Sequence, residues 1–512
     1  MGQIISKEDF VPIREKLKKQ NKKIVLCHGV FDLLHYGHIE HFKDARKLGD
    51  ILVVSVTAAR YVNKGPGRPY FDNNQRMEFL SQIEVIDYVI LSEAVTVHEI
   101  IKYVQPDIYA KGKEYQKAEN DITGNIGSEE AIVKEYGGQI YFTDGQVYSS
   151  TKLLNKFFAA LPENVVTMSE HLKEKYGSNV MEQVRQYVDD FQNLKVAIVG
   201  DVIIDEYVFC NVQGVTMKDA SISTFYEYEE KYAGGALAVA RHVRNFADNV
   251  TLYSMTGYED ETARFIKEKM GGIRLKIVKE KDFVTPIKKR YLKQNVQRQE
   301  YDKLFSINHL MRRGERRELD HNTFNDLLAR ELGDYDVVLV CDFGHGLIDD
   351  DCIKVLEENS KFMCVNCQTN SANMGTNIIT KYHRADIFVV DERELRLAFG
   401  QALTMKEKLL NKLTTKLGAK SSWVTVGAEG AIGKCDKQLV RCPALTLKVK
   451  DTVGAGDAFY SLASLCGAAG VPIDIATLIA NTAGAIKTNV IGNKESVQKV
   501  DMLKFISTIL NV

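Results

Sequence analysis

The feature that most constrains this chain is the segment 22–50, where an apolar run, a glycine and two closely spaced histidines follow one another. Residues 24–27 predict a buried parallel strand, and Gly29 stands where the chain must turn. Apolar residues at helical spacing come next, so His35 and His38 are expected in the loop and at the start of a helix. Backbone N–H groups and the helix dipole favour an anion there. The segment therefore predicts a polyphosphate site in which two imidazoles stabilise charge on phosphate oxygens.

The residues up to about 155 continue as alternating strands and helices, which predicts a βαβ plan with a parallel sheet. Ligands of such sheets bind beyond the carboxyl ends of the strands, where the strand order reverses. Three basic elements are expected at that edge: the histidine loop, a Gly- and Pro-rich loop with Lys64 and Arg68, and a strand end with Lys111. The loop with Lys64 and Arg68 can fold over a phosphate, although an ordinary solvated loop would have the same composition.

A hydroxyl cluster at 149–151 follows, at the start of a further predicted helix, where it also suits an N-cap. The residues GVFDLLHYGH resemble the HxGH signature of the cytidylyltransferase-like nucleotidyltransferases, and the resemblance extends over about residues 22–155 through KGPGRP, NNQR, PDIYAKGKEY and SST. It implies that His35 and His38 are catalytic. The nucleotide- and phosphate-binding residues that it implies are Gly29, Phe31, Lys64, Arg68, Arg76, Lys111, Ser149, Ser150 and Thr151.

Within that family, the segment is more similar to the adenylyltransferase half of the bacterial heptose kinase/adenylyltransferase than to the enzymes for glycerol phosphate or choline phosphate. Those enzymes carry an arginine before the terminal Ser/Thr motif. Residues 142–145, Phe-Thr-Asp-Gly, stand in its place here. The departure favours a sugar phosphate as the acceptor.

Residues 162–194 show apolar positions at helical spacing and few helix breakers. They predict a helical connector that packs on the domain after it, because a flexible linker would be richer in Gly and Ser. We therefore expect a nucleotidyltransferase domain over 1–158, a connector over 159–193 and a second α/β domain over 194–512.

The strongest motif of the second half is DTVGAGD at 451–457. Gly454 to Gly456 allow consecutive backbone N–H groups to form an anion hole at a helix start, where charge builds up on a transferring phosphoryl group. Asp457 is placed to take the proton of an attacking hydroxyl. A simple tight turn with two aspartates is the alternative, but a second glycine turn at 425–430 favours the catalytic interpretation.

The motif resembles the DTxGAGD signature of the ribokinase family of sugar kinases, over about residues 194–512. The resemblance implies an α/β domain with a small β lid, for which residues 221–230 have strand character, and homodimers formed through that lid. It implies nucleotide contacts for Thr425, Gly427, Gly430, Gly454, Ala455 and Gly456. It implies sugar contacts for Asp205, Gly234, Gly235, Lys288 and Arg290. It also implies that Asp391 and Glu394 organise Mg²⁺ through water.

Three places depart from the kinase pattern. The family's asparagine after the glycine pair is Ala238 here, its DPK is Asn366-Cys-Gln, and the asparagine of its NxxE is Asp391. These departures leave open which sugar is used. They also leave open whether this half turns a substrate over or serves only in binding or dimerisation.

Composition points to small ligands. The formal net charge is -1, so neither nucleic acid nor a membrane is an expected partner. Nine cysteines without a disulfide-like framework, and a start without a signal-peptide pattern, predict free thiols and a cytoplasmic protein. Cys364 and Cys367 continue an apolar run, so they are expected to be buried strand residues and not a metal site.

The two resemblances together imply the synthesis of a nucleotide-activated sugar from sugar phosphates and nucleoside triphosphates. The second half would phosphorylate a sugar or sugar phosphate from ATP, and the first would join a nucleotide to a sugar 1-phosphate with release of pyrophosphate. The arrangement is most similar to the bifunctional enzymes that make ADP-heptose, with the two domains in reversed order. The alternative is a CTP-dependent cytidylyltransferase for a polyol or another sugar phosphate.

Overall fold

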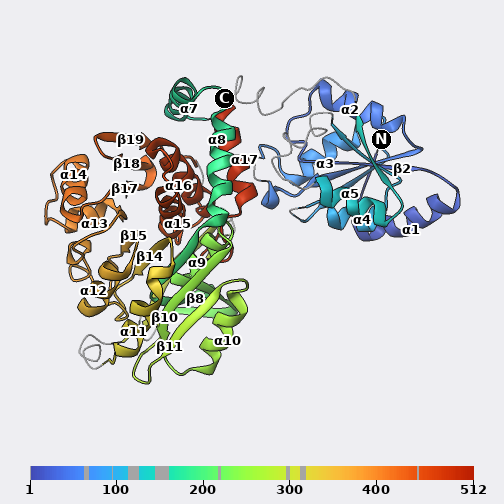
Figure 1. Ribbon diagram of the computed structural model, residues 1–512. Helices are drawn as coiled ribbons and strands as arrows, with labels where there is room; N and C mark the ends of the chain where they lie inside the picture. The colour runs from blue at the N-terminus through green and yellow to red at the C-terminus, as the bar shows by residue number, and fades with distance from the viewer. Residues whose placement is uncertain are drawn as a thin grey trace. The chain divides into compact units, whose positions relative to one another are not determined.

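The computed structural model describes residues 2–62, 69–94, 96–112, 126–143, 161–216, 219, 221–295, 300–311, 319–446 and 449–511. The chain forms two compact units, one of residues 1–166 with 503–512 and the other of residues 167–502 (Figure 1). Both units are α/β, as the sequence predicts. No helix in these ranges is both long and apolar enough to cross a bilayer.

The first unit is built on a six-stranded parallel sheet with the order β1-β4-β3-β2-β5-β6. The strands are β1 (Gln3–Ile5), β2 (Ile24–Gly29), β3 (Ile51–Thr57), β4 (Tyr88–Ser92), β5 (Ile108–Gly112) and β6 (Gln139–Thr143). The chain runs from β2 outward to β3 and β4 and then returns to β5 on the other side of β2. The strand order therefore reverses between β2 and β5, which is where open parallel sheets bind ligands.

Helices cover both faces of this sheet, because the central strands are apolar on both sides. They are α1 (Lys7–Lys19), α2 (Tyr36–Arg46), α3 (Asn73–Ser81), α4 (His98–Val104) and α5 (Ile126–Glu135). Val25 and Cys27 of β2 pack in one core cluster with residues of α2 and α3. Ile24 and Leu26 alternate with them and pack in a second cluster with residues of α1, α4 and α5.

Two helices, α7 (Glu163–Tyr176) and α8 (Val180–Asp190), occupy the stretch for which the sequence predicts a helical connector. The end of α7 packs on the second unit, as expected. Nζ of Lys175 and the hydroxyl of Tyr176 each lie 2.6 Å from a carboxylate oxygen of Asp474.

The second unit contains a nine-stranded sheet with the order β11-β10-β7-β14-β15-β16-β17-β18-β19. The strands are β7 (Lys195–Gly200), β10 (Asn249–Thr256), β11 (Arg274–Lys279), β14 (Val337–Asp342), β15 (Met363–Cys367), β16 (Ile387–Asp391), β17 (Ser421–Thr425), β18 (Ala431–Cys435) and β19 (Gln438–Cys442). All pairs from β11 to β17 are parallel, whereas β18 and β19 form an antiparallel edge. The strand order reverses between β7 and β14.

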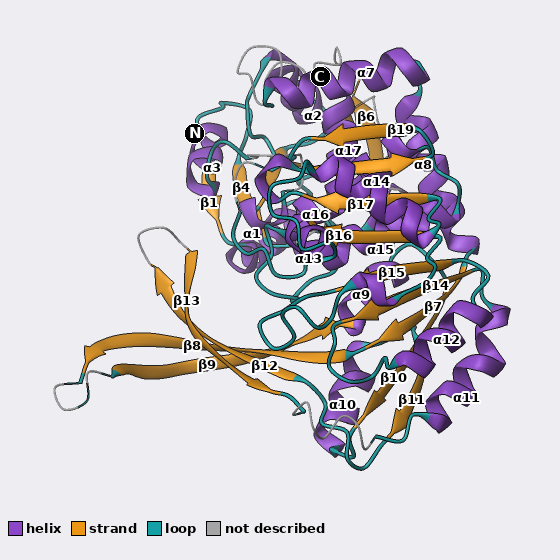
Figure 2. Ribbon diagram, turned by 90° about the vertical axis from the view of Figure 1, so that its left-hand side faces the viewer, coloured by secondary structure: helices purple, strands orange, loops and turns teal. Residues whose placement is uncertain are grey.

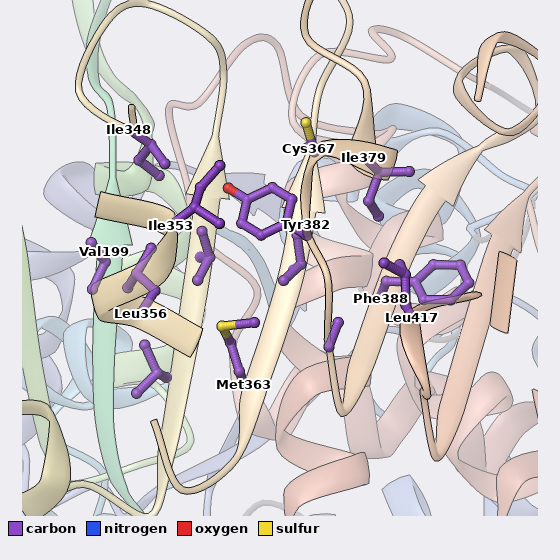
Figure 3. Packing of buried hydrophobic residues seen from close by; sticks show 14 of the residues in the cluster. Val199, Ile348, Ile353, Leu356, Met363, Cys367, Ile379, Tyr382, Phe388 and Leu417 are labelled. Carbon is purple, nitrogen blue, oxygen red and sulfur yellow. The ribbon is translucent and has the colours of Figure 1, made fainter. Parts of the chain in front are cut away.

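The helices of this part are α9 (Ala236–Arg244), α10 (Asp260–Lys269), α11 (Asn322–Glu331), α12 (Asp350–Asn359), α13 (Glu392–Leu397), α14 (Lys406–Leu417), α15 (Ala455–Ala468) and α16 (Ile473–Lys487). The last helix, α17 (Lys499–Leu510), begins in the second unit, and its residues from 503 on belong to the first. One core cluster, which includes Val199, Met363, Tyr382 and Phe388, packs between the sheet and helices α11 to α14 (Figure 3). Outside this cluster, α15 packs against α9, α16 and the sheet. All nine cysteines are free, and Cys364 and Cys367 lie buried in β15, as the sequence predicts.

A separate four-stranded sheet, the lid, extends away from the nine-stranded sheet (Figure 2). Its order is β13-β12-β8-β9. The strands are β8 (Val202–Val215), β9 (Ile222–Gly235), β12 (Ile287–Asn295) and β13 (Glu300–His309). The strand predicted over 221–230 is thus confirmed as part of β9.

Candidate active sites

The first candidate site lies where β2 ends and α2 begins. His35 is the N-cap residue of α2, and its imidazole stacks on that of His38 with the ring centroids 3.9 Å apart. The backbone N–H of His35 lies 3.4 Å from Nδ1 of His38. Burial lowers the pKa of His35, which favours its neutral form at pH 7. The structure therefore brings both predicted histidines together beside the first N–H groups of α2.

Gly29 and Phe31 shape the loop that leads to this pair of histidines. Phe31 has a left-handed backbone with φ +47°. Its ring packs edge-on against His38 at a centroid distance of 5.5 Å and lies 5.2 Å from the ring of Phe42. A Cβ at Gly29 would come within 2.9 Å of the Phe31 ring. The two residues thus shape the loop beside the histidines, and the nucleotide contacts that the sequence predicts for them stay a prediction.

Arg76 differs most from its predicted role as a phosphate ligand. Its side chain is fully buried, and its guanidinium donates to the carbonyl oxygens of Val30 at 2.7 Å, Thr57 at 2.8 Å and Phe71 at 3.1 Å. The planar fork of N–H donors suits three diverging carbonyl oxygens as well as it suits a phosphate. Arg76 therefore ties the loops after β2 and β3 to the start of α3, and we correct its role to a structural one.

Lys111 lies at the carboxyl end of β5, the strand next to β2, as predicted. Its ammonium forms an ion pair with the buried carboxylate of Glu129 on α5. The pair holds the lysine side chain at the edge where the strand order reverses. Sequence reasoning missed Glu129, because nothing in the spacing of the two residues connects them.

Two polar residues that sequence reasoning also missed anchor the loop between β3 and α3. Asp32 accepts hydrogen bonds from the backbone N–H groups of Tyr70 at 2.7 Å and Phe71 at 3.1 Å, and Asn73 accepts one from Ala59 at 2.7 Å. Asp32 stands inside the GVFD motif, which could have identified it. The predicted ligands outside the described residues are Lys64, Arg68, Ser149, Ser150 and Thr151.

Two further histidines connect neighbouring elements at the same end of the sheet. Nδ1 of His28 lies 2.7 Å from the hydroxyl of Ser55, which links β2 to β3. Nδ1 of His41 lies 2.7 Å from the hydroxyl of Thr143, which links α2 to the end of β6. Burial lowers the pKa of His41 to about 4, so this ring is neutral at pH 7.

The second candidate site lies at the start of α15. Gly454 is the N-cap residue with φ +80°, and a Cβ there would lie 2.3 Å from Oδ1 of Asn493. A Cβ at Gly456 would meet no atom within 4 Å. The backbone N–H groups of this turn are therefore not covered by side chains of residues 454 and 456. An anion hole needs such a row of N–H groups at the start of a helix. Only a glycine fits at the first position of the turn.

Asp457 stands in the first turn of α15 and is buried. Burial, followed by the nearby charge of Asp205, raises its pKa to about 6. Nε2 of Gln368, which follows the end of β15, lies 3.3 Å from Oδ1 of Asp457. Asn366 donates to the carbonyl oxygen of Val389 at 2.9 Å in the interior. The segment that departs from the family's DPK therefore still supplies one hydrogen bond to the candidate base.

The predicted sugar-binding residues come together at the base of the lid. Asp205 of β8 forms an ion pair with Arg290 of β12 and accepts a hydrogen bond from Asn493 at 3.0 Å. A Cβ at Gly234 would lie 2.2 Å from Oδ2 of Asp205, so this carboxylate requires a glycine opposite it. Burial lowers the pKa of Lys288, which lies two residues before Arg290 on the same strand.

Gly235 and Asp201 close the base of the lid where β7 ends. Gly235 is the N-cap residue of α9 with φ +57°, and a Cβ there would lie 2.5 Å from the carbonyl oxygen of Asp201. The Asp201 carboxylate accepts hydrogen bonds from the backbone N–H groups of Phe343 at 3.0 Å and His345 at 3.3 Å. Asp201 therefore connects the ends of β7 and β14, where the strand order reverses. Ala238 lies buried within α9.

The second predicted glycine turn connects β17 to β18. Thr425 ends β17, and Gly427 and Gly430 have φ values of +52° and +98°. A Cβ at Gly430 would lie 2.1 Å from the carbonyl oxygen of Cys442. Because β17 is parallel to its neighbour β16, Thr425 lies at the same edge of the sheet as Asp391, with which it pairs.

Asp391 and Glu394 form a capping box at the start of α13. Oδ1 of Asp391 accepts from the backbone N–H of Glu394 at 2.6 Å, and Oε2 of Glu394 accepts from the backbone N–H of Asp391 at 2.8 Å. Oε1 of Glu394 accepts from the backbone N–H of Thr369 at 2.9 Å. Burial, followed by the charge of Asp391, raises the pKa of Glu394 to about 7. Both Glu394 oxygens are thus committed to backbone groups, whereas Asp391 is exposed.

Comparisons with known proteins match both halves of the chain. A family described as cytidylyltransferase-like matches residues 26–156, and one described as pfkB family carbohydrate kinase matches residues 193–499. Several curated relatives carry the name bifunctional protein HldE. The protein from Desulfatibacillum aliphaticivorans is 39% identical over 143 residues, which are 27% of this chain and 28% of the relative. The protein from Aliarcobacter butzleri is 34% identical over 147 residues, 28% of this chain and 29% of the relative.

The chain thus spans less than a third of the length of these curated relatives. Among solved structures, phosphofructokinase-2 from Escherichia coli with substrates and products has a TM-score of 0.49 at 13% identity, over 61% of this chain and 98% of that one. A ribokinase from Thermotoga maritima has a TM-score of 0.46 at 16% identity, over 61% of this chain and 99% of that one.

Proposed function

Because the chain belongs to the pfkB family of carbohydrate kinases and carries a cytidylyltransferase-like domain ahead of the kinase, we propose that it makes a nucleotide-activated sugar in two steps. The second unit phosphorylates a sugar or sugar phosphate, and the first joins a nucleotide to a sugar 1-phosphate. The observation that carries this proposal is that the predicted catalytic residues of each unit stand at the start of a helix, where backbone N–H groups favour an anion. His35 and His38 stand at the start of α2, and the turn from Gly454 to Asp457 stands at the start of α15.

In the kinase step, Asp457 takes the proton of a sugar hydroxyl as its oxygen attacks the γ-phosphorus of ATP, and ADP leaves. Backbone N–H groups from Gly454 to Gly456 stabilise the charge on the transferring phosphoryl group. The hydrogen bond from Gln368 keeps the Asp457 carboxylate in place. Asp205 and Arg290, at the base of the lid, are the groups that bind the sugar.

In the transferase step, a phosphate oxygen of the sugar 1-phosphate attacks the α-phosphorus of the nucleotide, and pyrophosphate leaves. His35 and His38 donate hydrogen bonds to the phosphate oxygens, so no covalent intermediate with the protein is needed. Lys111 holds a phosphate at the neighbouring strand end. The sequence resemblance of residues 22–155 favours ATP as the nucleotide and a heptose phosphate as the acceptor.

Mg²⁺ is proposed to accompany the nucleotide in both steps, where it would neutralise phosphate charge. The described residues contain no group of three side chains that could hold a metal by themselves. Asp391 fits the role of a ligand through water, because it is exposed at the carboxyl end of β16. Glu394 fits less well, since backbone N–H groups occupy both of its oxygens.

Homodimers are proposed to form through the lid. Large apolar side chains are exposed on two of its strands: Phe225, Tyr226 and Tyr228 on β9, and Phe305 and Ile307 on β13. Covering such a surface is favourable. The free cysteines suit a reducing cytoplasm, which we propose as the location.

The experiment that tests the function measures pyrophosphate release with ATP, CTP, GTP and UTP, each offered with heptose 1-phosphate, other sugar 1-phosphates and polyol phosphates. ADP formation with heptose 7-phosphate is followed in parallel. Turnover with ATP and both heptose phosphates is the expected result. Turnover only with CTP and a polyol phosphate would reassign the substrates, and no turnover with any pair would refute the proposal.

A further inference from the structure

Lys487, the last residue of α16, is a buried lysine that neither the sequence motifs nor the proposed mechanism uses. Its side chain is only 1% exposed. Its ammonium donates a hydrogen bond to the carbonyl oxygen of Gly492, in the turn that follows the helix. An apolar side chain of similar length would fill the same space without the cost of burying a charge. Packing alone therefore does not account for a lysine here.

The side chain of Lys487 lies against the glycine turn of the kinase site. A Cβ at Gly454 would lie 3.2 Å from Cε of Lys487, which is the carbon that carries the ammonium. The same Cβ would lie 2.3 Å from Oδ1 of Asn493. Helices α15 and α16 pack together along this side of the turn. A positive charge is thus held directly behind the first residue of the anion hole, on a different helix from the hole itself.

Charged groups from several elements surround this ammonium. The charged or titratable residues that interact electrostatically with it are Asp451, Asp457, Asp205, Arg241 and His242. Burial is the largest influence and lowers the pKa of Lys487 to about 8, while the three carboxylates favour its charged form and Arg241 opposes it. Burial also lowers the pKa of His242 to about 3, so that ring is neutral. The ammonium is therefore charged at pH 7 and loses its proton on the alkaline side.

We propose that Lys487 is a positioning residue of the kinase site, whose fixed positive charge strengthens the anion hole at Gly454 to Gly456 and keeps Asp457 ionised. The proposal rests on the kinase activity proposed above. A charge acts strongly over several ångströms where water is excluded. The hydrogen bond to Gly492 prevents the ammonium from turning away. The site thus gains a cation that does not have to be recruited from solution.

The test compares Lys487→Met with Lys420→Met in the full chain. Lys420 is a matched control, because its side chain is 67% exposed and pairs with Asp386, before the amino end of β17 and thus at the opposite edge of the sheet. ADP formation with ATP and heptose 7-phosphate is followed from about pH 5 to pH 10. For Lys487→Met, kcat is expected to fall about 100-fold, while Lys420→Met follows the unaltered chain. Pyrophosphate release in the transferase step should be unchanged in both variants.

The pH profile separates this role from simple packing. Without Lys487, the alkaline limb near its pKa of about 8 should disappear, and the acid limb set by Asp457 should shift to higher pH. A Lys487→Met variant with an unchanged profile, at either normal or reduced kcat, overturns the proposal. If that variant does not fold, Lys487→Ala with added methylammonium replaces it. Restored turnover supports the proposal, and no restoration by methylammonium overturns it.

A second measurement does not require turnover. ATP added to the unaltered chain should raise the melting temperature less at pH 9 than at pH 7, because the ammonium next to the anion hole has lost its proton. In Lys487→Met this difference should vanish. If the unaltered chain forms no ADP, the proposed kinase function fails, and ATP binding alone decides the proposal. Equal pH dependence of the shift in both proteins then overturns it.

Discussion

The two candidate sites differ in the groups that they offer to a phosphate. In the first unit, the groups proposed to meet phosphate are the side chains of His35 and His38, which lie three residues apart at the start of α2. In the second unit, the start of α15 carries glycines and Asp457, and further polar and charged groups come from elsewhere in the chain. Gln368 reaches Asp457 from the end of β15, and Lys487 reaches Gly454 from α16.

The difference shows what each design depends on. A site made from neighbouring side chains depends on one loop and on the residues that shape it, such as Phe31. A site made from backbone N–H groups leaves room for the phosphoryl group. Side chains from other elements must supply further charge, so the site depends on the packing of several helices and strands. Substitutions should therefore separate the two activities cleanly.

Asp457→Asn should have the largest effect. Without a carboxylate to accept the hydroxyl proton, sugar-dependent ADP formation should fall by about 10⁴-fold, while pyrophosphate release stays normal. In the unaltered chain, kinase turnover should fall as the pH drops through about 6, because protonated Asp457 cannot act as a base. Both are measured by coupled ADP assays across pH. Unchanged ADP formation by the variant would exclude Asp457 as the base.

His38→Ala should have the next largest effect, on the other activity. Loss of one hydrogen-bond donor to the reacting phosphates should lower pyrophosphate release by about 10³-fold. The kinase step serves as the internal control and should not change. Normal nucleotidyl transfer by this variant would show that His38 does not act on the reacting phosphates.

Gly454→Ala tests the dependence of the second site on bare backbone. The new Cβ would lie 2.3 Å from Oδ1 of Asn493 at a φ of +80°, so the free energy of unfolding should fall by about 2 kcal/mol. Gly456→Ala is the matched control, because its Cβ would meet no atom within 4 Å. Urea unfolding of both variants measures the difference. Equal stabilities would show that the turn relaxes around the added methyl group.

His41 gives the smallest expected effect and concerns the first unit. Its pKa is about 4 in the folded protein and 6.5 as an ordinary value, so only the unfolded chain takes up a proton between these pH values. Its contribution to stability is complete above pH 6.5 and is lost as the pH falls toward 4. The unaltered chain should lose about 1 kcal/mol more than His41→Gln between pH 7 and pH 5.5. Hydrogen exchange of α2 and β6 at both pH values measures this, and identical losses would contradict the assignment.

The sequence by itself determined the α/β class of both units, the strand and helix around the two histidines, and the glycine turn before Asp457. These features are local, because apolar periodicity and glycine placement act within a few neighbouring residues. The lid strand at 221–230 could be predicted for the same reason.

Only the tertiary structure decided how the side chains are used. An arginine at 76 is equally suited to phosphate and to carbonyl oxygens, and the packing of three loops gave it the carbonyls. Gln368 departs from the family's motif and Lys487 belongs to none, yet both reach the start of α15 because β15 and α16 end beside it. Contacts between residues so far apart in the chain depend on how whole elements pack, which no local pattern records.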